Sequence, residues 1–140
     1  MKSLKKYKCL IIGLGNIAFK YDLNTKNKEV ISHANAIKKN KSLILCGGVD
    51  ILKKNRDLFK KNYKVETFKY LDYALTKTMP DIIIISVPTE HHLKIIKKIT
   101  YKKFIKIIIC EKPFGYNFKQ SKEVLNLVNS RTRILKNVYL

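Results

Sequence analysis

The chain has 140 residues, of which 46% are hydrophobic, and this length and apolar content suit one domain with a buried core. No apolar run reaches the roughly 18 residues that a membrane-spanning helix needs, so a membrane protein is not expected. The formal net charge is +20, yet only three of the 30 basic residues are arginines. Because arginine is the residue that most often binds bases and phosphates, we expect a solvated lysine surface rather than a nucleic-acid site.

Apolar runs of strand length alternate with segments of helical periodicity along almost the whole chain. In chain order, the expected elements are a strand at 8–12, a helix at 16–21, a polar loop at 22–32, a helix at 33–39, a strand at 43–49, a helix at 51–61, a strand at 64–68, a helix at 71–77, a strand at 81–87, a helix at 89–102, a strand at 106–110, a helix that begins at 117 and a strand at 133–138. Strands separated by helices imply parallel pairing through right-handed crossovers. We therefore predict one doubly wound α/β domain with a mostly parallel sheet over residues 1–140.

Two segments carry clear local signals. The strand at 81–87 reads DIIIISV, and such an unbroken β-branched run is typical of a central strand covered on both faces. Asn117 and Gln120 have the spacing of a capping box and predict the start of the last helix.

The cysteines and the N-terminus bear on the type of protein. Cys9, Cys46 and Cys110 lie far apart, each in or at the end of an apolar run. Their spacing and odd number do not suggest a metal site, so we expect buried, reduced thiols.

The basic start MKSLKKYK precedes an apolar run, 9–12, that is too short for the core of a signal peptide. We therefore expect a cytoplasmic protein.

The first expected strand runs directly into a turn with two glycines, in the stretch CLIIGLGNIA. Gly13, Gly15 and Ala18 match the pattern G-x-G-x-x-A, which has meaning between a strand and a helix. Gly13 would permit a tight turn with positive φ, Gly15 would let a pyrophosphate approach the backbone, and Ala18 would let the helix pack closely. The amides of Asn16 and Ile17, at the positive end of the helix dipole, would face the anion. The alternative is a tight turn with a purely structural role.

Asp50 ends the second expected strand, where an acid can hold the hydroxyls of an adenosine ribose. It lies 37 positions after Gly13, further than the usual spacing of about 20, and the polar loop at 22–32 accounts for the extra length. An acid there repels a 2′-phosphate, which favours NAD over NADP. The alternative for Asp50 is an N-cap ahead of Ile51, and both roles can hold together.

Two further segments at strand ends are more specific than the glycines. SVPTEHH, at 86–92, follows the isoleucine strand, and CEKPFG, at 110–115, ends the next strand. Together with the glycine turn, and in this order, they closely resemble the Gfo/Idh/MocA oxidoreductases, the glucose–fructose oxidoreductase and inositol dehydrogenase group. The resemblance covers essentially the whole chain. It implies a Rossmann fold that binds NAD and hydride transfer between the nicotinamide and a hydroxyl of a sugar, nucleotide sugar or cyclitol.

The resemblance also implies roles for matching positions. Pro88, Thr89 and His92 would belong to the loop that passes the nicotinamide side of the cofactor. Glu111 would lie near the nicotinamide ribose, and Lys112 would lie near the reacting carbon, before a peptide bond that is often cis in this family. An ammonium at that place can hydrogen-bond the substrate oxygen, stabilise a developing alkoxide and join a proton relay.

Family members continue into a second α/β domain that supplies most of the substrate pocket. This sequence ends in the last expected Rossmann strand, so we expect that C-terminal substrate domain to be absent from this chain. Alone, the chain would then bind the dinucleotide weakly and transfer hydride poorly. The alternative is a regulatory module that binds a nucleotide without chemistry and has no need for Lys112. His33 and His91 are expected to be surface or packing residues.

Overall fold

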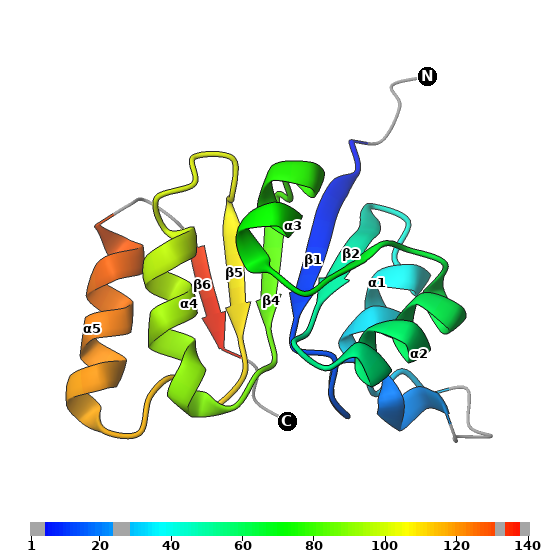
Figure 1. Ribbon diagram of the computed structural model, residues 1–140. Helices are drawn as coiled ribbons and strands as arrows, with labels where there is room; N and C mark the ends of the chain where they lie inside the picture. Colours follow the sequence, from blue (N-terminus) through cyan, green and yellow to red (C-terminus); the bar gives the residue numbers. More distant parts are fainter. Residues whose placement is uncertain (1–4, 24–28, 131–133, 138–140) are drawn as a thin grey trace.

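Six parallel strands form one sheet in the part of the chain that the computed structural model describes, residues 5–23, 29–130 and 134–137 (Figure 1). The strands are β1 (Tyr7–Ile12), β2 (Leu43–Val49), β3 (Thr67–Phe68), β4 (Ile82–Ile85), β5 (Ile107–Cys110) and β6 (Ile134–Asn137). Their order across the sheet is β3-β2-β1-β4-β5-β6, and every neighbouring pair is parallel. This order is that of a doubly wound Rossmann sheet and confirms the predicted fold class.

Helices cover both faces of the sheet. They are α1 (His33–Lys39), α2 (Lys53–Tyr63), α3 (Leu71–Thr78), α4 (His92–Ile99) and α5 (Phe118–Asn129), with short 3-10 helices η1 (Lys20–Leu23) and η2 (Thr89–His91). Helices α1 and α2 contribute buried side chains to one core cluster, and α3, α4 and α5 contribute to the other. None of the described helices has the length and apolar character needed to cross a membrane.

The isoleucine run of β4 lies in the middle of the sheet, as its sequence predicts. All four of its side chains are buried, and they alternate between the two core clusters. Ile83 and Ile85 pack in the cluster under α3, α4 and α5, whereas Ile82 and Ile84 pack in the cluster under α1 and α2. A strand covered on both faces has no polar side, which is why its run is unbroken.

The segment after the first strand differs from its prediction, because residues 16–21 do not form an α-helix. The chain makes a turn there and then forms η1. A regular helix would use the carbonyls of Ile17 and Ala18 for its own ladder. Instead, Ile17 accepts a hydrogen bond from the His33 amide at 3.1 Å, and Ala18 accepts one from the Ala34 amide at 2.9 Å. The first turn of α1 therefore takes these carbonyls and prevents the helix.

Several other element boundaries differ from their predictions. Helix α2 begins at Lys53 rather than 51, β3 contains only two residues, and the helix expected at 89–102 divides into η2 and α4. Lys64, with φ 56°, follows α2 in the left-handed region and turns the chain toward β3. Strand β3 is short because only two of its residues pair with β2, opposite the last two residues of that strand, at the edge of the sheet.

The start of α5 contains half of the predicted capping box. Asn117 Oδ1 accepts a hydrogen bond from the Gln120 amide at 2.9 Å, as predicted. Gln120 Oε1 returns to the amide of Tyr116, at 3.0 Å, rather than to that of Asn117. The reciprocal bond therefore lies one residue earlier than in a capping box.

Candidate functional site

The glycine turn lies at the carboxyl end of β1, beside the point where the strand order reverses. Gly13 has φ +89°, in the region that favours glycine, as expected for a tight turn. A Cβ at this position would lie 2.7 Å from the carbonyl carbon and oxygen of Ser86, which follows β4. Two independent constraints therefore require glycine here: the backbone conformation and the close approach of a neighbouring strand end.

Gly15 is different, because a Cβ added to it would meet no protein atom within 4 Å. Packing within the described chain therefore does not explain a glycine at this position. In the described part of the chain, the amides of Gly15, Asn16 and Ile17 also donate to no protein acceptor. Ala18, in contrast, is fully buried against Leu14 and other residues of the core. The turn thus presents bare backbone on one side and packs tightly on the other.

Asp50 holds the glycine turn and the end of β2 together. Its Oδ2 accepts hydrogen bonds from the Leu14 amide at 2.8 Å and from Asn55 Nδ2 at 3.0 Å. Its Oδ1 accepts one from the Leu52 amide at 2.8 Å. Because Leu52 is itself the N-cap of α2, Asp50 lies too early to be that cap and forms an Asx turn before the helix. The carboxylate is fixed in place, and Oδ1 retains capacity for another donor.

Basic side chains lie around this carboxylate. Lys20 Nζ donates to Asn55 Oδ1 at 2.7 Å, and Asn55 in turn donates to Asp50. Arg56 Nη1 donates to the backbone carbonyls of Asp50 and Ile51, at 2.8 and 2.9 Å. No local motif in the sequence indicates these contacts, because they depend on how η1 and the start of α2 fold against the end of β2.

Glu111 and Lys112 follow β5, at the same edge of the parallel sheet as Gly13 and Asp50 (Figure 1). The Glu111 amide donates to the carbonyl of Ile85, at the end of β4, at 2.9 Å. Lys112 is exposed, and its ammonium makes no ion pair or hydrogen bond with the described residues. The Lys112–Pro113 peptide bond is cis, as the family resemblance implies.

The loop after β4 joins the loop after β5 through His92. Pro88 is exposed and Thr89 is half-buried, whereas the His92 side chain has no exposed surface. The His92 Nε2 lies 2.9 Å from the carbonyl oxygen of Val87, and its Nδ1 lies 3.0 Å from that of Pro113. His92 therefore positions the two loops, and it would have to leave this place to touch a cofactor directly.

Cys110 lies next to this histidine but is not a nucleophile. Its Sγ is 3.5 Å from His92 Nδ1, and the side chain is fully buried. Burial raises the pKa of the Cys110 thiol to about 12, with a smaller contribution from the charge of Glu111. The thiol is therefore protonated at neutral pH, and a thiolate mechanism has no support here.

A further pair of side chains meets at this edge of the sheet without any local signal in the sequence. His33 Nε2 lies 2.6 Å from Glu111 Oε1, and the two side chains are 15% and 12% exposed. The residues are 78 positions apart, and neither has a local motif that points to the other. Only the topology, which places the start of α1 beside the ends of the strands, could have suggested the contact.

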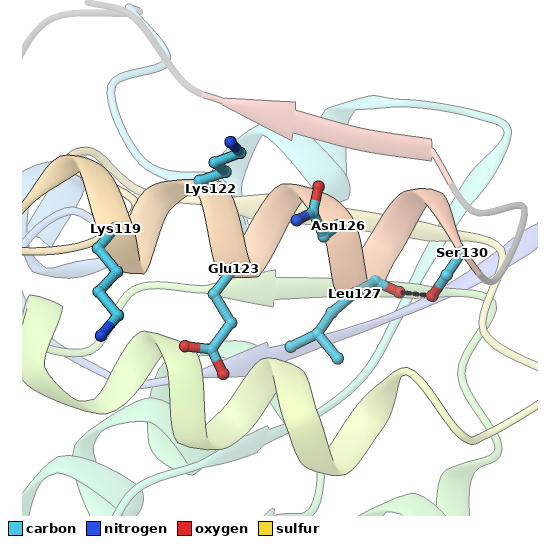
Figure 2. Close-up of a pocket in the computed structure, with 6 residues that line it drawn as sticks. All are labelled: Lys119, Lys122, Glu123, Asn126, Leu127 and Ser130. Carbon is cyan, nitrogen blue, oxygen red and sulfur yellow. Dashed lines mark hydrogen bonds between the residues drawn. The ribbon is translucent and has the colours of Figure 1, made fainter.

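A shallow hollow elsewhere on the surface holds none of these residues. Figure 2 shows it along α5, lined by Lys119, Lys122, Glu123, Asn126, Leu127 and Ser130. Five of these residues lie along α5 and Ser130 is its C-cap, and Glu123 is paired with Lys97 of α4 at 2.7 Å. The hollow is therefore the groove beside a solvated helix. In the described part of the chain, no group of three or more His, Cys, Asp or Glu side chains is placed to hold a metal ion.

The chain matches a protein family along almost its whole length. A family model described as an oxidoreductase family with an NAD-binding Rossmann fold matches residues 7–139. No curated protein sequence matches the chain.

Solved structures show the same fold. The WlbA dehydrogenase from Bordetella pertussis, in complex with NADH and UDP-GlcNAcA, has a TM-score of 0.80 at 16% identity and is matched over 96% of this chain and 35% of its own. The myo-inositol 2-dehydrogenase from Lactobacillus plantarum has a TM-score of 0.78 at 21% identity, over 96% of this chain and 36% of its own. An oxidoreductase from Agrobacterium radiobacter, in complex with NAD+, L-tartaric acid and magnesium, has a TM-score of 0.80 at 16% identity, over 95% and 35%. The chain thus spans about a third of the length of these structures.

Proposed function

The chain belongs to the Gfo/Idh/MocA oxidoreductase family, whose NAD-binding Rossmann fold it matches over residues 7–139, and from this membership we propose that it binds NAD at the carboxyl edge of its sheet. We further propose that it is the cofactor-binding part of a dehydrogenase that acts on a hydroxyl of a sugar, nucleotide sugar or cyclitol. Solved structures with this fold include proteins in complex with NADH or NAD+.

One observation carries the proposal: a row of bare amides lies beside a fixed carboxylate. The amides of Gly15, Asn16 and Ile17 face no protein acceptor in the described chain, and backbone N–H groups of this kind bind a diphosphate. Asp50, tied to the same turn through the Leu14 amide, offers Oδ1 to the hydroxyls of the adenosine ribose. Its negative charge disfavours a 2′-phosphate, so we propose NAD rather than NADP.

The nicotinamide half of the cofactor would lie on the other side of the strand reversal. Pro88 and Thr89 would border it, and Glu111 would accept hydrogen bonds from the second ribose. The bound nicotinamide supplies a hydride acceptor or donor at its ring. Lys112, exposed and unpaired among the described residues, would hydrogen-bond the substrate oxygen and stabilise its negative charge during proton transfer.

We propose that turnover of a substrate requires more polypeptide than this chain provides. The chain spans 36% of the inositol dehydrogenase and a similar share of the other relatives. The proposed site lies on one open edge of the sheet, so water would reach the reacting atoms. We propose that a further segment or chain covers this edge and supplies most of the substrate contacts, and that hydride transfer without it is slow.

Titration of the protein with NAD tests the proposal, using Gly15→Val and Lys112→Ala. Valine at Gly15 has room for its Cβ in the protein, so a loss of NAD binding with unchanged thermal unfolding would come from a clash with the ligand. We expect Gly15→Val to weaken binding at least about tenfold, and Lys112→Ala to keep it. Wild-type protein that does not bind NAD, or binding that is indifferent to Gly15→Val, would contradict the proposal. Binding without any turnover when a covering domain is supplied would favour a regulatory module instead.

A further inference from the structure

The contact between His33 and Glu111 joins the two halves of the domain. His33 begins α1, which follows the glycine turn, and Glu111 follows β5 and directly precedes Lys112. Both side chains are largely buried, at 15% and 12% exposure, and their Nε2 and Oε1 atoms are 2.6 Å apart. An ionised carboxylate only accepts hydrogen bonds, so the imidazole is the donor. Such a short, charge-assisted contact fixes both side chains.

The backbone on each side of this pair is anchored to the proposed cofactor site. The amide of His33 donates to the carbonyl of Ile17 at 3.1 Å, which places the start of α1 against the glycine turn. The amide of Glu111 donates to the carbonyl of Ile85 at 2.9 Å, which places the carboxylate beyond the end of β4. The pair therefore crosses the carboxyl ends of β1 and β4, where the strand order reverses.

The arrangement at Glu111 matches the arrangement at Asp50. Each carboxylate lies just beyond a strand, and each has an oxygen held by a donor from a distant segment of the chain: the Leu14 amide for Asp50 and the His33 imidazole for Glu111. In each case the other oxygen retains capacity to accept from a hydroxyl. A dinucleotide has two ribose diols, one on each side of its diphosphate.

We propose that His33 is a positioning residue that holds Glu111 ready to accept hydrogen bonds from the nicotinamide ribose. This inference rests on the proposed function, since it assumes that a dinucleotide lies across the crevice. His33 itself touches neither cofactor nor substrate. Without its donor, Glu111 loses the partner of a carboxylate that is only 12% exposed, and the side chain turns toward water. The nicotinamide half then loses a preorganised contact, whereas the adenosine half keeps Asp50 and the glycine turn.

Comparing NAD with ADP tests this proposal, because ADP reaches the glycine turn and Asp50 but has no second ribose. Calorimetric titrations would use wild type, His33→Leu, His33→Gln, Glu111→Gln and the double variant His33→Leu/Glu111→Gln. We expect His33→Leu to weaken NAD about fivefold and to leave ADP within about twofold. His33→Gln, which restores an N–H donor, should recover most of the NAD affinity. The two single losses should not add in the double variant, because His33 acts on the cofactor only through the side chain at position 111.

His91 offers a matched control, since it is a histidine near the same edge whose side chain is 54% exposed. His91→Leu should change neither affinity. Equal weakening of NAD and ADP by His33→Leu, or unchanged NAD affinity, would overturn the positioning role. If His33→Leu does not fold in thermal denaturation, His33→Phe, which keeps an aromatic ring but has no N–H donor, carries the same comparison. NAD binding that depends on Gly15 but not on His33 overturns this inference alone, whereas wild-type protein that does not bind NAD overturns the proposed function as well.

Discussion

Replacing Gly13 with alanine should destabilise the fold, whereas the same replacement at Gly15 should not. The φ of +89° at Gly13 costs an L residue about 1–2 kcal/mol. The added Cβ would also lie 2.7 Å from the carbonyl atoms of Ser86. Ser86 cannot easily move away, because its amide donates to Ile12 and its hydroxyl donates to Gly13, each at 2.8 Å. Overpacking of this kind costs about 1–3 kcal/mol more. The free energy of unfolding should therefore fall by about 2–5 kcal/mol.

Urea unfolding, followed by circular dichroism, measures this difference. With a slope of about 2 kcal/mol per molar, the midpoint for Gly13→Ala should fall by about 1–2.5 M. The midpoint for Gly15→Ala should stay within about 0.3 M of wild type, because its Cβ meets no protein atom within 4 Å. A wild-type midpoint for Gly13→Ala would refute the strained turn and its contact with Ser86. A large fall for Gly15→Ala would refute the open space at Gly15, and a loss of NAD binding in Gly15→Val would then no longer identify a ligand.

Three further predictions follow from single side chains. Burial acts to raise the pKa of Asp81, but hydrogen bonds from the Lys106 ammonium and a backbone amide outweigh it, so this pKa lies below its usual value. Asp81 therefore stabilises the fold above its unfolded-state pKa of about 3.9, and this contribution to the free energy of unfolding is lost as the pH falls through the folded-state pKa. As the pH is lowered below about 4, the urea midpoint should therefore fall less steeply for Asp81→Asn than for wild type. Burial raises the pKa of Cys9 and Cys110 to about 12, so mass spectrometry should find both thiols unlabelled by iodoacetamide at about pH 8 until the protein is unfolded, and labelling of the folded protein would contradict their burial. Lys112→Ala should leave the urea midpoint unchanged and the NAD affinity within about threefold of wild type. Any hydride transfer that can be measured spectrophotometrically should be lost. Undiminished turnover would show that Lys112 takes no part in the reaction.

The features that sequence analysis predicted well depend on local pattern. Four consecutive isoleucines identify β4 as a central strand, because a strand with no polar face must be covered on both sides. Gly13 is identifiable as the residue of a tight turn because it directly follows an apolar strand. That the candidate residues lie together at one edge of the sheet also follows from the sequence, since the carboxyl ends of parallel strands meet at one edge. That Asp50, Glu111 and Lys112 meet a cofactor there stays a prediction.

The features that sequence analysis missed depend on contacts between distant residues. Glu111 and His33 are 78 positions apart, and the bond from the Leu14 amide to Asp50 spans 36 positions. Residues 16–21 have a composition that allows a helix, but α1 returns to take the carbonyls that the helix would need. The sequence of one segment does not indicate that amides from a distant segment will bind its backbone carbonyls. Tertiary contacts of this kind override local propensity.

The loss of the expected helix changes what would hold a diphosphate at the glycine turn. A long helix after the turn would add the field of its aligned peptide dipoles. Here η1 has only four residues, and the first two amides of α1 are taken by the carbonyls of Ile17 and Ala18. For a diphosphate bound as proposed, the attraction would come from hydrogen bonds to the bare amides of the turn itself, and the lysine-rich surface would add a field that salt screens within about 10 Å. Hydrogen bonds depend steeply on distance and angle. That dependence explains why the missing side chain at Gly15, where the protein has ample room, would matter more for binding than any single lysine.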